Sequence, residues 1–150
     1  MKTIDAQELL TILPHRYPFL MIDRVLNYDE QSIEAIKNFT VNEPYVQGHF
    51  PGNPIMPGVM MIEAMAQTST VLAFKYIESN QEIARYFKGL DILFSSADDV
   101  KFKQVVRPGD QLHVFSTLIR NARNLFEFDA RVEVKNIIVA QARLKAVVGM

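Results

Sequence analysis

Glu63 is the only residue with a formal charge between Glu43 and Lys75. It falls within an apolar stretch that predicts a buried helix, and glutamate is almost never fully buried unless it is paired. An unpaired carboxyl group would be driven to its neutral form by desolvation. We therefore expect a polar partner beside Glu63. Gln67 is one candidate, because it lies one turn later on the same helical face.

His49 is the second candidate, because its loop precedes the predicted helix and can fold back over the helix start. Histidine exchanges protons near neutral pH, and together with a carboxyl group it can form an acid–base pair. The spacing leaves two interpretations open: a catalytic pair, or a structural histidine with a glutamate that holds a loop. We expect no metal site, because the chain has no cysteine and its three histidines are scattered.

An acid–base pair of this kind suits the removal of water from a 3-hydroxyacyl thioester. Such a reaction takes a weakly acidic proton from C2 and protonates the hydroxyl group on C3. Negative charge develops on the thioester oxygen, which the free N–H groups at a helix N-terminus can stabilise. Gly58 is well placed there, because a residue without a side chain lets its backbone approach a ligand closely.

The helix that carries Glu63 is predicted from Val59 to about Ile77, with apolar residues on every face. A helix of this kind is buried. The loop before it, from Asn42 to Gly58, contains four prolines and three glycines, and long irregular loops are usually functional or disordered. Its aromatic and apolar residues favour an ordered loop.

The remaining segments predict a short helix that Asp5 to Glu8 begins, and strands with alternating apolar and polar residues. The expected strands cover residues 20–28, 32–39, 100–106, 112–119, 126–134 and 138–146. Turns are expected at Asn27 to Gln31 and at Lys135-Asn136. This order predicts an α+β fold, with an antiparallel sheet wrapped around one central helix, in a single domain over residues 1–150.

Composition narrows the classes of function. The chain has 150 residues, of which 49% are hydrophobic and 22% charged, and its net charge is −1. This near-neutral balance argues against a nucleic-acid or membrane-surface protein. Its first residues lack the apolar stretch of a signal peptide, so we expect a cytosolic location.

Several motifs together resemble the FabZ-type 3-hydroxyacyl-acyl carrier protein dehydratases of type II fatty acid synthesis. The matching segments are Leu13 to Leu20, Asp23 to Val25, Lys37-Asn38, Asn42 to Pro44, Gly48 to Val59, Ile62 to Gln67 and Pro108 to Asp110. Their order and spacing make the resemblance more specific than any single motif.

The resemblance implies a hot-dog fold and dimers that often assemble into hexamers, with active sites at the dimer interface. It implies that His49 and Glu63 are the catalytic pair and that the Gly58 N–H binds the thioester carbonyl. It also implies no cofactor, and an acyl carrier protein as the partner that delivers the substrate. The other substrate-binding positions that it implies are Phe50, Pro57, Val59 and Gln67.

Some questions stay open at this level. The tyrosine proposed as a tunnel gate in the family corresponds either to Tyr86 or to Leu93. Hot-dog thioesterases, dehydratases with added isomerase activity and non-catalytic acyl-binding modules are alternatives. A structural role is favoured for His15, and a core role for at least half of Met56, Met60, Met61 and Met65. The basic residues proposed as a docking rim for an acidic carrier are Arg85, Lys88, Lys101, Lys103 and Arg107.

Overall fold

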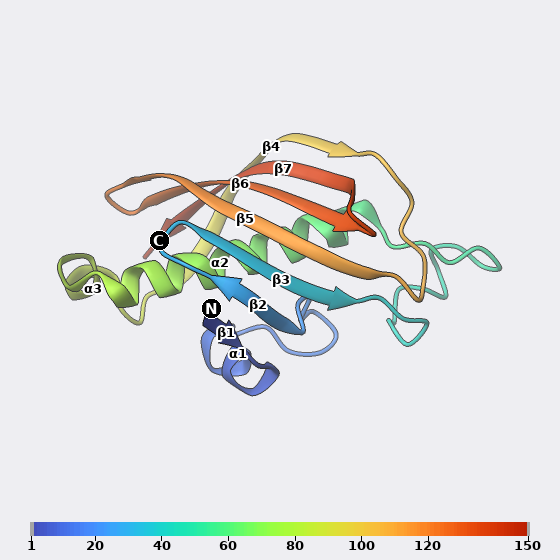
Figure 1. Cartoon of the computed structure of the whole chain (residues 1–150), viewed down its shortest axis with the longest axis horizontal. Helices are drawn as coiled ribbons and strands as arrows, with labels where there is room; N and C mark the ends of the chain where they lie inside the picture. The colour runs from blue at the N-terminus through green and yellow to red at the C-terminus, as the bar shows by residue number, and fades with distance from the viewer. Residues whose placement is uncertain (1, 150) are drawn as a thin grey trace.

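The computed structural model describes residues 2–149. Three helices and seven strands follow one another along the chain (Figure 1). They are β1 (Lys2–Ile4), α1 (Ala6–Ile12), β2 (Arg24–Tyr28), β3 (Ser32–Asn38), α2 (Gly58–Ser79), α3 (Gln81–Phe87), β4 (Ile92–Phe102), β5 (Gln111–Ala122), β6 (Leu125–Val134) and β7 (Ile137–Val148).

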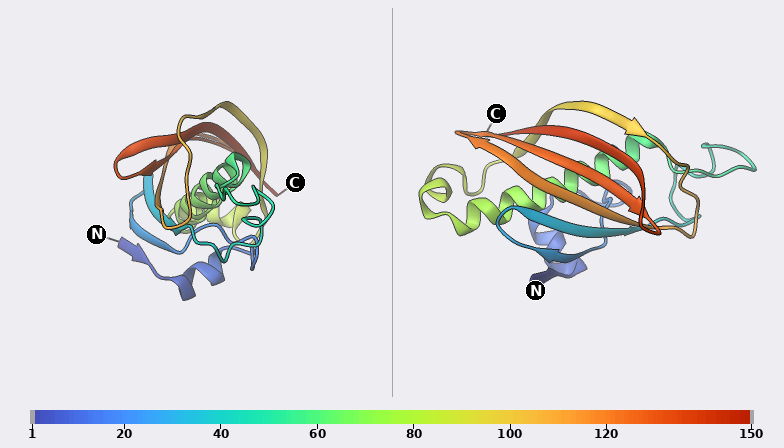
Figure 2. Two further views of the ribbon diagram at one scale, coloured as in Figure 1. Left: turned by 90° about the vertical axis from the view of Figure 1, so that its right-hand side faces the viewer. Right: turned by 45° about the horizontal axis from the view of Figure 1, so that its top comes forward.

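The seven strands form one antiparallel sheet in the order β1-β2-β3-β5-β6-β7-β4. The sheet curls around α2, which runs along its concave face (Figures 1 and 2). Helix α2 packs against β3, β5, β6, β7 and β4, five strands that follow one another in the sheet from β3 to the β4 edge. The predicted sheet wrapped around one central helix is therefore confirmed.

Helix α2 is buried along most of its length because its residues are apolar or small on every face. From Ala64 to Ala73 every residue is buried, and Ile77 is buried near the end. The threonine hydroxyl groups in this stretch find acceptors within the helix, since Thr68 and Thr70 each donate to the carbonyl four residues earlier. Of the four methionines singled out above, Met56, Met61 and Met65 belong to the hydrophobic core, and Met60 packs against it. Their predicted core role is confirmed.

The turn chemistry expected from the sequence is present at two places. Asp5 caps α1, since its carboxylate accepts the Glu8 backbone N–H at 2.9 Å. Lys135 and Asn136 join β6 to β7 with φ values of 52° and 62°. Two successive left-handed residues are typical of the type I′ turn, whose twist matches that of the flanking strands.

The expected strand at residues 100–106 is wrong in its bounds, because β4 begins at Ile92 and ends at Phe102. Strand β4 lies at the edge of the sheet, so much of it is exposed and its middle is polar, which hides the strand pattern. Beyond Phe102, the Lys103 N–H still donates to the Val139 carbonyl on β7, whereas the Val106 carbonyl accepts from the Met56 N–H, outside the sheet.

Two short elements were not expected, namely β1 and α3, and the expected strand at residues 20–28 begins only at Arg24. Helix α3 falls in the polar segment after α2, where Asn80 supplies a side-chain cap to the Ile83 N–H. Short elements of this kind depend on tertiary contacts, because a short helix gains little stability from its own hydrogen bonds. Within residues 2–149, no helix is both long and apolar enough to cross a membrane.

Candidate active site

Glu63 projects from the second turn of α2, with 26% of its side chain exposed. Its Oε1 accepts a hydrogen bond of 2.8 Å from the Gln67 amide. Gln67 also donates to the Phe19 carbonyl at 2.7 Å and accepts from the Met21 N–H at 2.8 Å. Both N–H donors of this buried amide are thus used by the protein, and its oxygen also accepts a bond. Gln67 holds Glu63 in place and has no donor left for a ligand.

His15 is a second neighbour of Glu63, and the sequence did not point to this contact. The His15 Nε2 lies 3.4 Å from the Glu63 Oε1. His15 belongs to the proline-bounded turn after α1, so its approach to α2 depends on how that turn packs. A lone histidine in a turn carries no signal of such a contact, which explains why only a structural role was favoured.

A cavity of about 440 Å³ opens beside Glu63. Helix α2 and His15 form one wall, and the first half of β4 forms the other. A second cavity of about 430 Å³ lies between the turn after α1, the second half of α2 and the segment after α3. Both cavities are lined by His15, Thr70, Ile92 and Leu93, so they adjoin one another. An apolar chain entering beside Glu63 has room to continue past these residues.

His49 is fixed by its own loop. Its Nδ1 lies 3.0 Å from the Ile55 carbonyl oxygen, and the Ile55 N–H donates back to the His49 carbonyl at 2.9 Å. Because a carbonyl oxygen only accepts, Nδ1 carries a proton. In the neutral ring Nε2 is then free to accept one, which is the state that a general base requires.

The loop around His49 is anchored at both ends. At its start, the buried Lys37 Nζ lies 2.6 Å from a Glu43 carboxylate oxygen. Tyr45 stacks on Phe39, and burial together with the Glu43 charge raises the pKa of Tyr45 above its ordinary range. At its end, Arg107 donates to the Asn53 side chain at 2.8 Å. The motif residues Lys37 and Glu43 thus support this loop.

His49 and Glu63 do not contact one another within a single chain. Among residues 2–149, the polar contacts of Glu63 are with Gln67 and His15, and that of His49 is with Ile55. The catalytic pair therefore stays a prediction, and one chain by itself does not assemble it.

Gly58 is the first residue of α2, and the ring of Phe102 covers it. A Cβ atom at Gly58 would lie 2.8 Å from that ring, so the ring would have to move if residue 58 carried a side chain. Beside it, Pro57 is buried whereas the Val59 side chain is 66% exposed. Phe50, stacked on His49, is 50% exposed. These exposed apolar residues flank the predicted site.

Comparison with known proteins identifies the family. The model of the FabA-like domain family matches residues 13–143. The 3-hydroxyacyl-(acyl-carrier-protein) dehydratase FabZ of Shewanella woodyi is 44% identical over 145 residues, covering 96% of this chain and 91% of the relative. The FabZ of Albidiferax ferrireducens is 46% identical over 149 residues, covering 97% and 95%. This chain belongs to the FabZ dehydratase family.

Solved structures agree with the hot-dog fold of the FabZ family. The dehydratase heterocomplex ApeI:P from Xenorhabdus doucetiae superimposes with a TM-score of 0.78 at 16% identity, over 95% of this chain and 91% of that one. The thioesterase HI1161 from Haemophilus influenzae gives a TM-score of 0.62 at 15% identity, over 85% and 77%. At these identities the likeness concerns the fold alone, which hosts more than one chemistry.

The sequence leaves two candidates, Tyr86 and Leu93, for the position that corresponds to the tunnel gate proposed in the FabZ family. Leu93 lies on β4 and lines both cavities beside Glu63. Tyr86 lies on α3, is 71% exposed and lines neither of them. Of the two candidates left open by the sequence, the structure favours Leu93 as the residue at the gate position.

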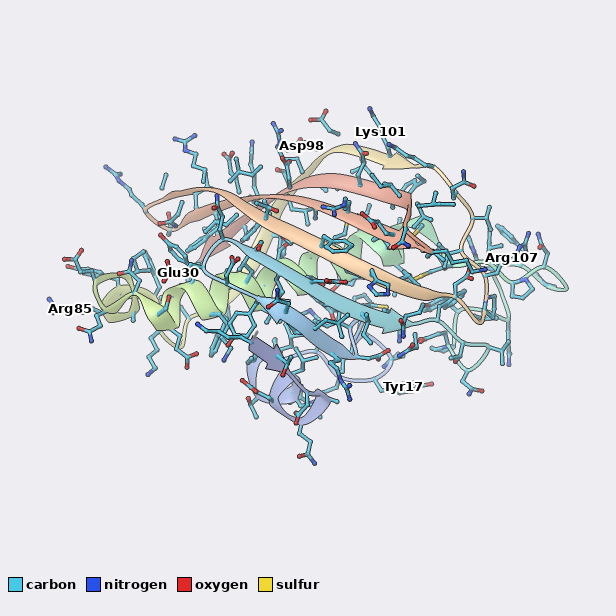
Figure 3. The ribbon with its side chains drawn as sticks, viewed as in Figure 1. Tyr17, Glu30, Arg85, Asp98, Lys101 and Arg107 are labelled. Carbon is cyan, nitrogen blue, oxygen red and sulfur yellow. The ribbon has the colours of Figure 1, made fainter. Side chains whose placement is uncertain are left out.

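Two of the basic residues proposed as a docking rim, Arg85 and Arg107, lie far apart within one FabZ chain. Figure 3 shows Arg85 beside α3 and Arg107 beyond the opposite end of the sheet, with Lys101 along β4. A single chain therefore presents these cations at separate places. Arg107 is the one in contact with the His49 loop.

Proposed function

We propose that this FabZ-family chain removes water from (3R)-3-hydroxyacyl chains carried on acyl carrier protein, and that His49 and Glu63 perform the reaction. The product is the trans-2-enoyl chain on the same carrier, as part of fatty acid biosynthesis. The observation that carries the proposal is the state of the Glu63 carboxyl group. One oxygen is held by Gln67, and the group lines a cavity roomy enough for an acyl chain.

The two side chains divide the proton transfers. The free Nε2 of His49 takes the C2 proton, and the Glu63 carboxyl group gives its proton to the C3 hydroxyl group, which leaves as water. The double bond forms between C2 and C3, and the proton gained by His49 balances the one lost by Glu63. The Gly58 N–H lies at the N-terminus of α2, where it can donate to the thioester oxygen as negative charge develops there.

Two chains are needed if His49 is to reach a Glu63. Among residues 2–149, strand β4 pairs only with β7, so its other edge is open there. An open edge is a template for pairing with another strand. We propose that β4 pairs with β4 of a second copy, which brings the exposed Phe50 and Val59 into an interface. His49 of one copy then faces Glu63 of the other, and such dimers can assemble further into hexamers.

The activity is tested with a 3-hydroxyacyl chain on acyl carrier protein. Enoyl absorbance should rise without release of free thiol, because dehydration keeps the thioester that a thioesterase would cleave. The variants H49A and E63Q should each lower kcat by about 10²–10⁴, the usual contribution of one positioned acid or base. Wild-type rates in both folded variants would overturn the assigned roles.

The shared site is tested by pairing the two inactive chains. In a mixed dimer of H49A and E63Q, one site combines the intact His49 of one chain with the intact Glu63 of the other. Co-expression should therefore restore a fraction of the wild-type rate, whereas each variant alone stays inactive. If the mixed dimers form and remain inactive, the two residues act within one chain and the interface proposal is wrong.

A further inference from the structure

We infer that His15 is a positioning residue for Glu63, which donates its Nε2–H to the Glu63 Oε1 and so keeps Oε2 directed at the substrate. The inference deepens the proposed function and rests on it. It starts from the distance of 3.4 Å between the two side chains and from the place of His15 in the wall of the same cavity.

The backbone of His15 is held firmly enough to place its ring. The neighbouring Arg16 guanidinium donates to three carbonyl oxygens: those of Leu10 and Leu13 at 2.8 Å each, and that of His15 at 2.7 Å. Leu13 is buried in the core, and the Phe19 N–H closes the turn on the Arg16 carbonyl. A charged group that satisfies three carbonyls makes this turn rigid.

The other ring nitrogen of His15 decides where the proton lies. Nδ1 is buried and has no hydrogen-bond partner among residues 2–149. A proton on Nδ1 would be a buried donor without an acceptor, and leaving a buried donor unpaired is costly. The neutral ring therefore carries its proton on Nε2, the nitrogen that faces Glu63. His15 thus presents a donor to the carboxyl group.

Two donors then converge on one oxygen of Glu63. Gln67 and His15 both approach Oε1, whereas Oε2 has no hydrogen-bond partner in the described chain. The acidic proton is thereby confined to Oε2, the oxygen that the described residues leave free. When Glu63 gives up this proton, its negative charge is met by two N–H groups. The contact with His15, longer than an ordinary hydrogen bond, should shorten at that stage, because bonds to charged groups are shorter and stronger.

The experiment compares H15F with H15Q. Phenylalanine keeps a flat ring of similar size and removes the donor, whereas glutamine places an amide N–H near the position of Nε2. H15F should lower kcat by roughly 10- to 100-fold, the effect of one hydrogen bond to a charged group. KM should change less than about twofold, and H15Q should recover most of kcat, because His15 acts through the acid and not through substrate binding.

A double-mutant cycle with E63D separates positioning from general structure. Aspartate keeps an acid but withdraws the carboxyl group from both donors, so H15F should then have little further effect on kcat. An equal loss in both backgrounds, or H15F at the wild-type kcat, would overturn the inference. If H15F fails to fold, H15L replaces it as the donor-free variant. Absence of dehydration in the wild-type chain would instead refute the proposed function itself.

Discussion

At the scale of single residues, the side chains of the predicted site are held in place by hydrogen bonds. Gln67 donates both amide N–H groups, to Glu63 and to the Phe19 carbonyl, and accepts the Met21 N–H. His49 is committed to the Ile55 carbonyl through Nδ1. Each catalytic candidate is therefore presented through the one atom that the protein leaves free. Precise placement of this kind is what makes a positioned acid or base effective.

Gly58 allows a test of which contact requires glycine. In G58A the new methyl group would meet the Phe102 ring at 2.8 Å, so the ring or the start of α2 must move. We expect kcat to fall by at least about 10-fold if one oxyanion donor is displaced. The double variant G58A/F102L should regain much of the rate, because the smaller side chain makes room. Steady-state kinetics measures all three variants, with F102L alone as the control. Recovery in G58A/F102L assigns the loss to the contact with the Phe102 ring, and no recovery contradicts that assignment.

At the scale of elements, α2 is tied to the sheet by one buried pair of hydroxyl groups. The Ser69 Oγ donates to the Met65 carbonyl at 2.8 Å and lies 2.7 Å from the Ser116 Oγ on β5. Since the Ser69 hydroxyl group donates its hydrogen to the Met65 carbonyl, Ser116 must be the donor in the bond between the two serines. The two serines therefore differ in what their removal leaves behind.

This asymmetry predicts an order of stabilities. S69A leaves the buried Ser116 hydroxyl group without a partner and should lower the free energy of unfolding by about 1–3 kcal/mol. S116A should cost less, because Ser69 keeps its bond to Met65. The double variant should be more stable than S69A. Urea unfolding measures all three, and S79A, at an exposed serine with a similar local bond, serves as the matched control.

The turn between β2 and β3 adds a pH-dependent contribution. The Asp29 carboxylate accepts the N–H groups of Gln31 and Ser32 at 2.8 and 2.7 Å, and these bonds lower the pKa of Asp29 from its ordinary value of 3.8. A depressed pKa in the folded state stabilises the fold above the unfolded pKa, and this stability is lost as the pH falls through the folded pKa.

We therefore expect D29N to be slightly less stable than the wild type at neutral pH, with the difference shrinking as the pH falls below about 3.8. Denaturant midpoints measured from pH 7 down to pH 2 test this, and D5N, at another exposed capping aspartate, shows how specific the effect is. A difference that stays constant over this range would contradict the assignment to the Asp29 charge.

At the scale of the whole molecule, the open edge of β4 and the separated basic residues bear on where a second copy and the acyl carrier protein can bind. Arg107 lies by the His49 loop and Arg85 at the far end near α3 (Figure 3). If the carrier docks near His49, R107E should raise KM for the carrier-bound substrate several-fold, most strongly at low salt. R85E is the matched control at the opposite end.

A small thioester without the carrier separates docking from damage to the loop. Because such a substrate makes no contact with carrier side chains, R107E should leave its kcat/KM nearly unchanged. An equal loss with both substrates would show that Arg107 acts through Asn53 and the His49 loop instead. An effect of R85E as large as that of R107E would place the docking surface elsewhere.

The sequence by itself predicted the buried helix, most of the strands and the family. Local periodicity marks the buried helix and the strands with one wet face, because side chains repeat every 3.6 or 2 residues in these structures. The isolation of Glu63 in an uncharged helix predicted its need for a partner, and Gln67, one turn later, is that partner. The ordered motifs pointed to the FabZ family, whose members match nearly the whole chain.

Only the tertiary structure decided which distant residues meet. The approach of His15 to Glu63, the choice of Leu93 over Tyr86 beside the cavity and the edge position of β4 all follow from how the sheet curls over α2. These contacts join segments far apart in the sequence, and no local spacing encodes them. They arise because burying the apolar faces of many elements at once leaves a single arrangement of the chain around the helix.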